Sequence, residues 1–339
     1  MSDVSANLPQ ATPGPDVVCV IVTYAARRAL LCQVLDALPA QGVRRAVVVD
    51  NGARWPLRAE LAAKYGDFVD VVEMGRNTGS APGFAAGMRR ASETGAGFIW
   101  LLDDDNCPHP GALSALLEEY RRQARGVDAA RLAVGAFRPV GQEGIAPRRL
   151  TPRHSSYCGF HVLDIPRKLI KRTPARRLLP RARLPSTIPV GVAAYSGLLF
   201  NSMLVQQVGL PREDFVLYCD DYEWSLRITS QGGRIVLVTH AIVTDLERTW
   251  RGRFKNHPLS LLRGRGDSVA YYAMRNAVFF YGKLWRRNNF IYFINRALFN
   301  GLLSVLAAAT HLGKRHALLR RAAEDGAAGR LGANPEFPL

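Results

Sequence analysis

The sequence predicts an α/β fold with a doubly wound, mostly parallel sheet, on three observations. Short apolar runs alternate with amphipathic segments through the first 137 residues. The apolar runs are continuous and β-branched, which is typical of strands buried on both faces of a parallel sheet. Polar residues follow the ends of several runs, and sheets of this kind bind ligands beyond the carboxyl ends of their strands. We therefore expect a site at one edge of the sheet.

The elements of the first half follow in chain order. Strands are expected at 17–24 (VVCVIVTY), 46–52 (AVVVDNG), 68–74 (FVDVVEM), 98–102 (FIWLL) and 131–137 (RLAVGAF). Helices are expected between them at 30–38, 57–64, 82–92 and 109–123, where apolar residues recur with helical spacing or a proline marks the first turn. The alternation of strand and helix is the pattern that predicts a parallel sheet.

The second half of the chain departs from this alternation. Residues 138–188 hold many prolines and arginines, so we expect a basic, loop-rich insertion there. GVAAYSGLLFN is strand-like, DDYEWSLRITSQGG favours a helix with an acidic first turn, and RIVLVTHAIVTD favours a strand or hairpin. The expected division of the chain is a leader at 1–15, an α/β domain at 16–246, a helical region at 247–325 and a tail at 326–339.

Charge and cysteine content restrict the class of protein. The net charge is +17, and residues 138–183 alone hold twelve basic residues against two acidic ones. Basic patches favour nucleic acid, anionic lipid or phosphorylated substrates. The five cysteines are scattered without a CxxC pair, which argues against a zinc site or a disulfide framework and favours a reducing compartment. The N-terminal residues lack the pattern of a signal peptide, so a cytoplasmic location is expected.

The segment FIWLLDDDNCPHP places Asp103, Asp104 and Asp105 directly after a buried strand. A solvated turn that caps the following helix is one interpretation. A divalent-cation site is the other, and the shared edge with other polar strand ends favours it. Carboxylate oxygens suit Mg²⁺ or Mn²⁺. Because alternate residues of an extended chain point in opposite directions, at most two of the three carboxylates easily reach one ion.

The glycine-rich segment GRNTGSAPGFAAGMRR follows the third strand. It matches neither a dinucleotide-binding motif nor a P-loop. Gly83 and Gly87 are expected to allow close helix packing, whereas Arg76 and Asn77 could approach a diphosphate.

Five segments in this order resemble the family-two inverting glycosyltransferases of the GT-A fold, nearest to the bacterial rhamnosyl- and galactofuranosyltransferases of cell-surface polysaccharide synthesis. They cover most of residues 17–137 and 190–246 and are VIVTYAARRALLCQVLDAL, AVVVDNGA, GRNTGSAPGFAAGMRRA, GFIWLLDDDNCPHPGAL and DFVLYCDDYEWSLRITSQGG. The resemblance implies a metal-dependent inverting transfer of rhamnose, galactofuranose or a similar sugar. The implied donor is UDP- or dTDP-linked, and the implied acceptor is a hydroxyl of a cell-surface glycan or a polyprenyl-linked molecule.

The resemblance also assigns residues to the donor and the metal. It implies that Asp50 faces the nucleotide base with Thr23 alongside, that Arg76 and Asn77 line the nucleotide and diphosphate, and that Asp103 and Asp105 hold Mn²⁺ or Mg²⁺. Tyr24 and Asp104 are expected beside the donor. Relatives often end the next strand with a histidine metal ligand. Here that position holds Asp245, which is the candidate third ligand, and His240 is the second candidate.

The motif CDDYEW is similar to the acidic motif whose second acid is the catalytic base in that family, which implies Asp221 as the base. Asp220 and Glu223 are then expected to hold the acceptor or to tune the base. The alternative is the ordinary preference for acids in the first turn of a helix, worth only about 0.3–1 kcal/mol. That preference explains one acid more easily than three.

Two interpretations of the region 268–318 stay open. Its mixture of aromatic, leucine and basic residues fits helices that lie on an anionic membrane surface, at the inner face of the cell membrane. It equally fits a helical subdomain packed on the sheet, and YYAMRN (271–276) resembles a segment of the same enzyme subgroup. Basic residues interrupt every window long enough to span a membrane except a marginal one at 297–312.

Two other classes of protein remain as alternatives. A sugar nucleotidyltransferase would need a glycine-rich basic loop after the first strand, where this chain has TYAARR. A nucleic-acid-binding protein would use the basic stretch 138–183, but no helix-turn-helix, RRM or zinc pattern accompanies the charge. Nucleic acid is therefore not an expected partner.

Overall fold

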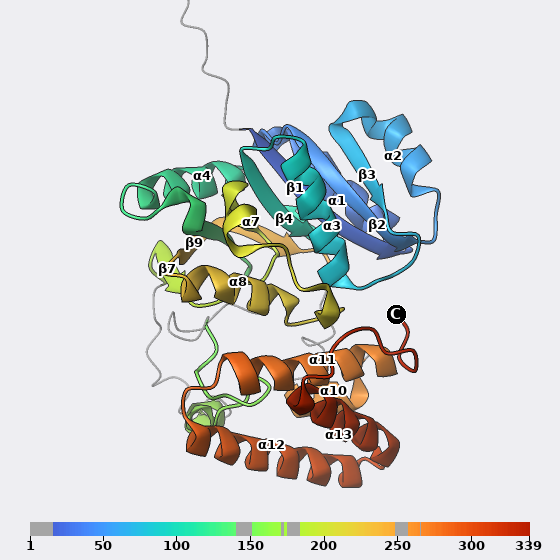
Figure 1. Ribbon diagram of the computed structural model, residues 1–339, viewed down its shortest axis with the longest axis vertical. Coiled ribbons are helices and arrows are strands. Elements are labelled where there is room, and N and C mark those ends of the chain that lie inside the picture. The colour runs from blue at the N-terminus through green and yellow to red at the C-terminus, as the bar shows by residue number, and fades with distance from the viewer. Residues whose placement is uncertain (1–15, 140–150, 171–172, 175–183, 248–256, 265) are drawn as a thin grey trace, which may run out of the picture.

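A computed structural model describes residues 16–139, 151–170, 173–174, 184–247, 257–264 and 266–339, and nine strands of this part of the chain form one sheet (Figure 1). The strands are β1 (Val17–Ala25), β2 (Arg45–Ala53), β3 (Val69–Glu73), β4 (Phe98–Asp103), β5 (Asn106–Pro108), β6 (Leu132–Phe137), β7 (Thr187–Val190), β8 (Leu198–Asn201) and β9 (Arg234–Asp245). Their spatial order is β3-β2-β1-β4-β8-β6-β9-β5, and β7 also pairs with β9.

The predicted α/β class is confirmed, and the sheet is mixed. Strands β3, β2, β1 and β4 run parallel, as the alternation of strand and helix predicts. Strand β8 then lies antiparallel between β4 and β6. Strand β9 runs parallel to β6 and antiparallel to β5 and β7. The parallel order ends at β4, because β8 pairs with it in the antiparallel direction, and an apolar run of four residues does not predict that direction.

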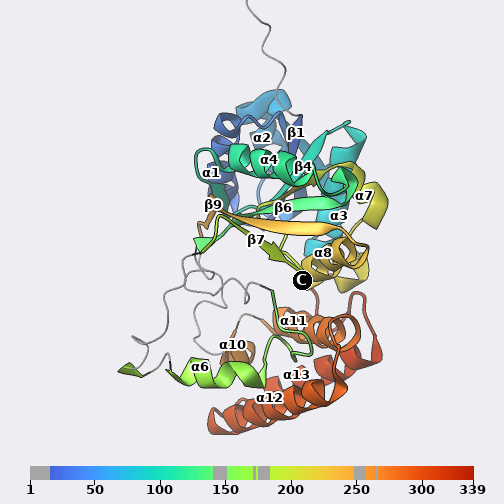
Figure 2. The ribbon, with the colours of Figure 1, turned by 90° about the vertical axis from the view of Figure 1, so that its left-hand side faces the viewer.

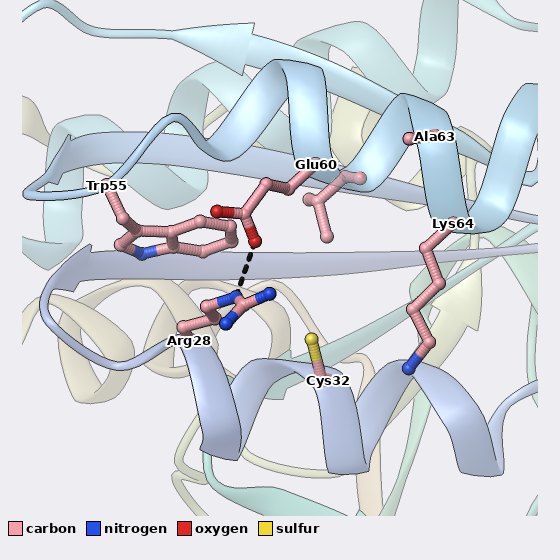
Figure 3. A pocket seen from close by; sticks show the side chains of 7 residues that line it. Arg28, Cys32, Trp55, Glu60, Ala63 and Lys64 are labelled. Atoms are coloured by element: carbon pink, nitrogen blue, oxygen red, sulfur yellow. Dashed lines mark ion pairs between the residues drawn. The ribbon is translucent and has the colours of Figure 1, made fainter.

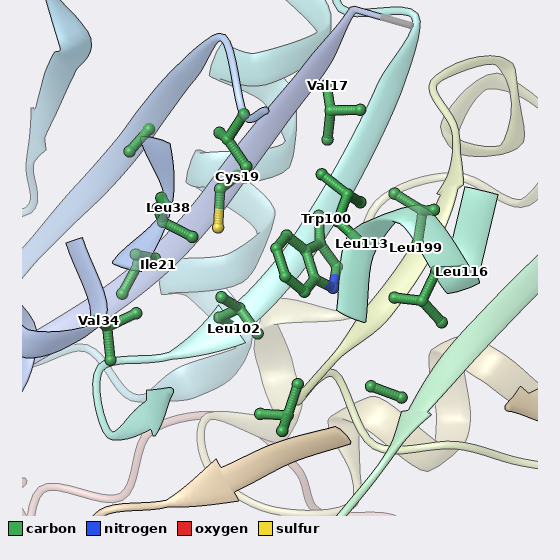
Figure 4. Close-up of a cluster of buried hydrophobic side chains, with 14 of the residues drawn as sticks. Val17, Cys19, Ile21, Val34, Leu38, Trp100, Leu102, Leu113, Leu116 and Leu199 are labelled. Atoms are coloured by element: carbon green, nitrogen blue, oxygen red, sulfur yellow. The ribbon is translucent and has the colours of Figure 1, made fainter. Parts of the chain in front are cut away.

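Helices cover both faces of the sheet. Helices α1 (Arg28–Ala37), α2 (Leu57–Tyr65) and α4 (Ala112–Gln123) pack on one face, and α3 (Ser80–Glu93), α7 (Met203–Val208) and α8 (Asp220–Ser230) pack on the other. Because successive strand residues point to opposite faces, Cys19 and Ile21 join the first core while Val20 joins the second. Figure 4 shows Trp100 and Leu102 of β4 in the first core beside Leu113 and Leu116 of α4.

The C-terminal region forms a separate aromatic core next to α8 (Figures 1 and 2). Its elements are α10 (His257–Arg263), α11 (Asp267–Phe279), a π-helical turn (Phe280–Leu284), α12 (Asn289–Ala309) and α13 (Gly313–Ala328). The chain beyond α13 packs back on α11, where Phe337 stacks on Tyr271 with ring centroids 4.2 Å apart. The division of the chain into domains stays a prediction.

Parts of the predicted division lie outside the described residues. These are the leader at 1–15, residues 140–150, 171–172 and 175–183 of the insertion, and residues 248–256 and 265 of the helical region. The described part of the insertion includes short helical segments at Val162–Asp164 and Ile165–Ile170 (α6) as well as β7.

Candidate active site

The ends of the parallel strands align at one edge of the sheet. Register places Thr23 of β1 beside Asp50 of β2, and Val22 beside Asp103 of β4. Asp50 in turn lies beside Glu73 of β3. The polar residues that follow these strands therefore share one edge, as parallel strands require.

A first group of carboxylates, here called the β4 acidic cluster, comprises Asp103, Asp104, Asp105 and Asp245. Asp104 is buried and accepts hydrogen bonds from Thr23 Oγ1 (2.7 Å) and Arg27 Nε (2.8 Å). Arg27 also lies 3.3 Å from Asp105 through Nη2. Burial raises the pKa of Asp104 to about 6, although Arg27 and Thr23 favour its charged form. Burial and the Asp103 carboxylate raise the pKa of Asp105 to about 7.

Strand β9 brings the fourth carboxylate to this cluster. Asn106 pairs with Asp245 in the β5–β9 ladder, and its Nδ2 donates to Asp245 Oδ1 over 3.0 Å. Arg138 donates to both oxygens of Asp245, from Nε over 2.9 Å and from Nη2 over 2.8 Å. The Ser196 hydroxyl donates to Asp103. Two arginines thus offset part of the charge that the four acids concentrate, and the serine hydroxyl adds a neutral hydrogen bond.

The carboxylates of the cluster are the type of ligand that a divalent cation prefers, but their positions fit such an ion only in part. Asp103 and Asp105 supply the hard oxygen ligands that Mg²⁺ and Mn²⁺ prefer. Asp245, the expected third ligand, has both oxygens engaged by Arg138. Within the described ranges no group of three or more ligating side chains is assembled as a metal site. His240 is exposed and interacts electrostatically with Glu119 of α4, so the structure does not bring it to the cluster.

A second acidic group, here called the α8 acidic turn, comprises Asp220, Asp221 and Glu223. Asp220 is buried and accepts hydrogen bonds from the Ser80 hydroxyl of α3 (3.2 and 3.1 Å). Glu223 is buried and pairs with Arg227 one turn later (2.5 Å). Asp221 is half-buried, and its Oδ1 accepts from the backbone N–H of Tyr222 (2.8 Å).

The two acidic groups interact electrostatically. Burial and the adjacent Asp221 raise the pKa of Asp220 well above its ordinary value, and the Asp103 carboxylate of the β4 acidic cluster raises it further. The Tyr195 hydroxyl is buried without a hydrogen-bond partner among the described residues. Burial raises its pKa, as do all three acids of the α8 acidic turn. The α8 acidic turn therefore faces the same part of the molecule as the end of β4.

The loop before α3 and the loop before α8 contact each other closely. Ala81 donates its backbone N–H to the Val216 carbonyl (3.1 Å). Gly79 has φ of 95°, and a Cβ there would collide with the same carbonyl oxygen. The segment that precedes α8 is itself strained, with positive φ at Val216 (66°), Tyr218 (70°) and Cys219 (60°).

The residues that were predicted to contact the nucleotide differ in their burial and in their hydrogen-bond partners. Asp50 Oδ1 accepts from the backbone N–H groups of Gly52 (3.1 Å) and Ala53 (2.7 Å). Thr23 is completely buried, and its hydroxyl donates to Asp104. Tyr24 is partly exposed, and the guanidinium carbon of Arg27 lies 5.3 Å from the centroid of its ring. Arg76 is exposed, whereas Asn77 is half-buried in the loop.

Several contacts within the site were not expected from the sequence. Asn51 is buried and holds the loop before α3, accepting from Thr78 N (2.8 Å) and donating to the Gly79 carbonyl (2.9 Å). Arg27, Ser80, Arg138 and Ser196 contact acidic site residues as described above. The signal for Arg27 was the basic pair in TYAARR, directly after β1. Nothing local distinguishes Ser80, Arg138 or Ser196 from other residues of their types.

Two cavities lie near these elements. One of about 320 Å³ opens between α1 and α2, where Figure 3 shows Trp55 beside the Arg28–Glu60 ion pair. It contains none of the predicted site residues. The other, of about 570 Å³, lies between α8 and the end of the π-helical turn with the residues after it, and its lining includes Glu223, Arg227, Trp285 and Arg287.

Comparison with known proteins shows what the chain resembles. Residues 18–179 match the family model described as Glycosyl transferase family 2. Over 97 residues the chain is 42% identical to the galactofuranosyltransferase GlfT1 of Mycolicibacterium smegmatis, covering 27% of this chain and 31% of that protein. Residues 18–179, a little under half of the chain, thus resemble glycosyl transferase family 2. The chain spans less than a third of its curated relative.

One solved structure shows the same fold. GalNAc-T7 with UDP, GalNAc and Mn²⁺ superposes with a TM-score of 0.53 at 12% identity, over 77% of this chain and 47% of that one. TarS 1–349 of S. aureus gives a TM-score of 0.44 at 12% identity, over 93% of this chain and 92% of that one. The likeness to GalNAc-T7 is one of fold.

Proposed function

We propose that this chain is a metal-dependent inverting glycosyltransferase that moves one sugar from a nucleotide donor to a hydroxyl of a cell-surface glycan or lipid-linked acceptor. One observation carries the proposal. The Ser80 hydroxyl at the start of α3 donates to Asp220, the neighbour of Asp221, and Asn51 near the end of β2 donates to the adjacent Gly79 carbonyl, which joins the α8 acidic turn to the strand ends of the sheet. Galactofuranose, the sugar named for the curated relative, is the first candidate, with rhamnose next. UDP, named for GalNAc-T7, is the first nucleotide to test, with dTDP next.

In the proposed reaction Asp221 removes the proton of the acceptor hydroxyl. The acceptor oxygen donates an electron pair to the anomeric carbon from the side opposite the diphosphate. The bond from that carbon to the phosphate oxygen breaks, and the nucleoside diphosphate leaves with the bonding pair. Inversion at the anomeric carbon follows from this single displacement.

Asp103 and Asp105 are the residues that would hold Mn²⁺ or Mg²⁺. A bound dication neutralises the charge that accumulates on the departing diphosphate. The Mn²⁺ in the GalNAc-T7 structure supports this choice of metal. Asp104 serves the cluster differently, because Thr23 and Arg27 already engage its carboxylate.

We also propose that the protein is cytoplasmic and binds peripherally to the inner face of the membrane through α12. This helix is long and apolar enough to cross a membrane by length and composition, and only 28% of its most apolar window is buried. Phe290 (74%) and Val305 (65%) are among its exposed side chains. Tyr292 and Phe299 lie on its buried face, and the exposed cations Arg286 and Arg287 precede it. An apolar face next to cations suits an anionic bilayer surface.

Sedimentation with lipid vesicles tests this location. The wild-type protein should sediment with vesicles that contain anionic lipid and less with neutral ones. A Phe290→Ser and Val305→Ser double variant should bind about tenfold more weakly, because two exposed apolar side chains no longer enter the bilayer. Met203→Ser, at an exposed position of α7, is the control and should leave binding unchanged. Equal binding by the double variant and the wild type would contradict the role of α12.

The transfer reaction is tested with UDP-, dTDP- and GDP-sugars in the presence of Mn²⁺. Acceptor-dependent release of a nucleoside diphosphate, with an inverted glycosidic linkage by NMR, is the expected result. Release of pyrophosphate from a nucleoside triphosphate and a sugar phosphate would indicate a nucleotidyltransferase instead. Salt-sensitive retention on DNA that needs no metal would favour a nucleic-acid-binding protein.

A further inference from the structure

We infer that Arg275 and Asn276 of α11 are positioning residues for Asp221, acting through residues 214–219, here called the pre-α8 segment. The inference deepens the proposed function, and its catalytic part rests on that function. Asn276 is 0% exposed and Arg275 is 1% exposed. Burial of an amide and a guanidinium is costly unless their hydrogen bonds are made, so the partners of these groups reveal what they do.

All the partners of the Asn276 amide nitrogen lie in the pre-α8 segment. Its Nδ2 donates to the backbone carbonyls of Phe215 (2.6 Å), Leu217 (2.7 Å) and Tyr218 (3.1 Å). Its Oδ1 accepts from Arg275 Nε (2.9 Å), which fixes the orientation of the amide. One side chain of the C-terminal region thus holds three carbonyls of the loop that leads into α8.

Arg275 holds the start of the same segment. Its Nη2 donates to the carbonyls of Asp214 (3.3 Å) and Phe215 (3.1 Å). Its Nη1 donates to the carbonyl of Gly332 (2.5 Å), and the Gly332 N–H donates to the Asp214 carbonyl (2.6 Å). Arg275 therefore joins α11, the chain beyond α13 and the pre-α8 segment.

The backbone of the pre-α8 segment explains why such a clamp is needed. Val216 is β-branched and adopts φ of 66° and ψ of −65°, which is strongly disfavoured for an L-residue. Strained conformations persist only where surrounding contacts over-determine them. Cys219, the last residue of the segment, has φ of 60° and is the N-cap of α8, so its conformation sets the direction in which Asp220 and Asp221 leave the loop.

The same segment also meets the donor side of the site. The Val216 carbonyl accepts from Ala81 N at the start of α3, next to Gly79. A displacement of the pre-α8 segment would therefore move Asp221 relative to the loop before α3. A misplacement of 1 Å in a catalytic group can cost about a hundredfold in rate.

Asn295 of α12 offers a matched control. It is also 0% exposed, and it also bonds backbone groups of another segment, namely the carbonyl of Ser155 (2.8 Å) and the N–H of Val162 (2.8 Å). Asn276→Ala should raise hydrogen exchange of the backbone amides in residues 214–222, whereas Asn295→Ala should raise it at 155–163. This comparison needs no activity, so it tests the clamp even if the proposed transfer fails.

Kinetics then separate positioning from general stability. With the transfer assay in place, Asn276→Ala should lower kcat about 100-fold with the donor KM within twofold, and Asn295→Ala should leave kcat within threefold. In an Asp221→Asn background, Asn276→Ala should cost less than threefold, because the two residues act as a unit. If Asn276→Ala does not fold, Arg275→Lys provides the same exchange test at 214–222.

Unchanged exchange at 214–222 in both Asn276→Ala and Arg275→Lys would overturn the clamp. A fall in kcat no larger than that of Asn295→Ala would overturn the positioning of Asp221, as would a full additional loss in the Asp221→Asn background. Absence of transfer by the wild type, with the exchange pattern intact, would instead count against the proposed function alone.

Discussion

The two acidic groups of this protein are stabilised in different ways. The β4 acidic cluster meets guanidinium groups, since Arg27 contacts Asp104 and Asp105 while Arg138 contacts Asp245. In the α8 acidic turn, Asp220 meets a hydroxyl from Ser80 and burial raises its pKa. Cations beside carboxylates favour the charged form, and in the β4 acidic cluster they oppose the burial that raises the pKa of Asp104 to about 6 and that of Asp105 to about 7. In the α8 acidic turn, burial and the adjacent Asp221 raise the pKa of Asp220, and the Ser80 hydroxyl opposes them.

The largest expected effect concerns the α8 acidic turn. Asp221→Asn removes the proposed base and should lower kcat by about 10³-fold, within the range of general base catalysis. Donor binding, measured by isothermal titration with UDP and Mn²⁺, should stay within twofold. Asp36→Asn, an exposed acid paired with Lys64, is the control and should keep full activity. Near-normal transfer by Asp221→Asn would remove this residue from the base role.

A substitution in the β4 acidic cluster should weaken donor binding, which Asp221→Asn should leave unchanged. Asp103→Asn should weaken UDP binding in Mn²⁺ and lower kcat/KM by about 100-fold, because a charge-stabilising ligand of the proposed ion is lost. EDTA should abolish the wild-type reaction, and added Mn²⁺ should restore it. Asp128→Asn, an exposed acid before β6, serves as control. Transfer activity that EDTA does not reduce would show that the β4 acidic cluster does not act through a bound metal.

Substitution of Arg27 tests whether neighbouring cations stabilise the carboxylates of the β4 acidic cluster. Arg27→Met leaves the buried Asp104 without its main cation and should lower the free energy of unfolding by about 3 kcal/mol, as measured in urea. Adding Asp104→Asn should recover part of this loss, because the uncompensated charge disappears. Equal stability of the single and double variants would show that the pair does not couple.

Ser80 supplies the corresponding test for the α8 acidic turn, with the smallest expected effect. Ser80→Ala removes a neutral hydrogen bond to Asp220 and should lower the free energy of unfolding by about 1 kcal/mol. Ser80→Thr keeps the hydroxyl and should lose less. A loss of stability as large as that of Arg27→Met would show that the two acidic groups are not stabilised in different ways.

The sequence predicted the parts of this molecule that local pattern determines. The β-branched runs before Thr23, Asp50 and Asp103 give strands β1, β2 and β4, and parallel pairing then brings their ends together. An acidic first turn before an apolar helical pattern gives α8. These features depend on residues close in the chain, so periodicity and turn chemistry suffice.

The rest depends on contacts between residues far apart in the chain. Arg138 reaches Asp245 across 107 positions, and Asn276 reaches Leu217 across 59. Neither residue differs locally from the other arginines or asparagines of a basic chain. The direction of β8 likewise depends on its neighbours β4 and β6, which no run of four residues specifies.

A crystal structure with UDP and Mn²⁺ tests the central claim most directly, because anomalous scattering locates the metal independently of the protein model. We expect Mn²⁺ bound by Asp103 and Asp105 and by the diphosphate, with the Asp221 carboxylate facing the position of the transferred sugar. Metal bound elsewhere, or an Asp221 carboxylate directed away from the diphosphate, would contradict the account.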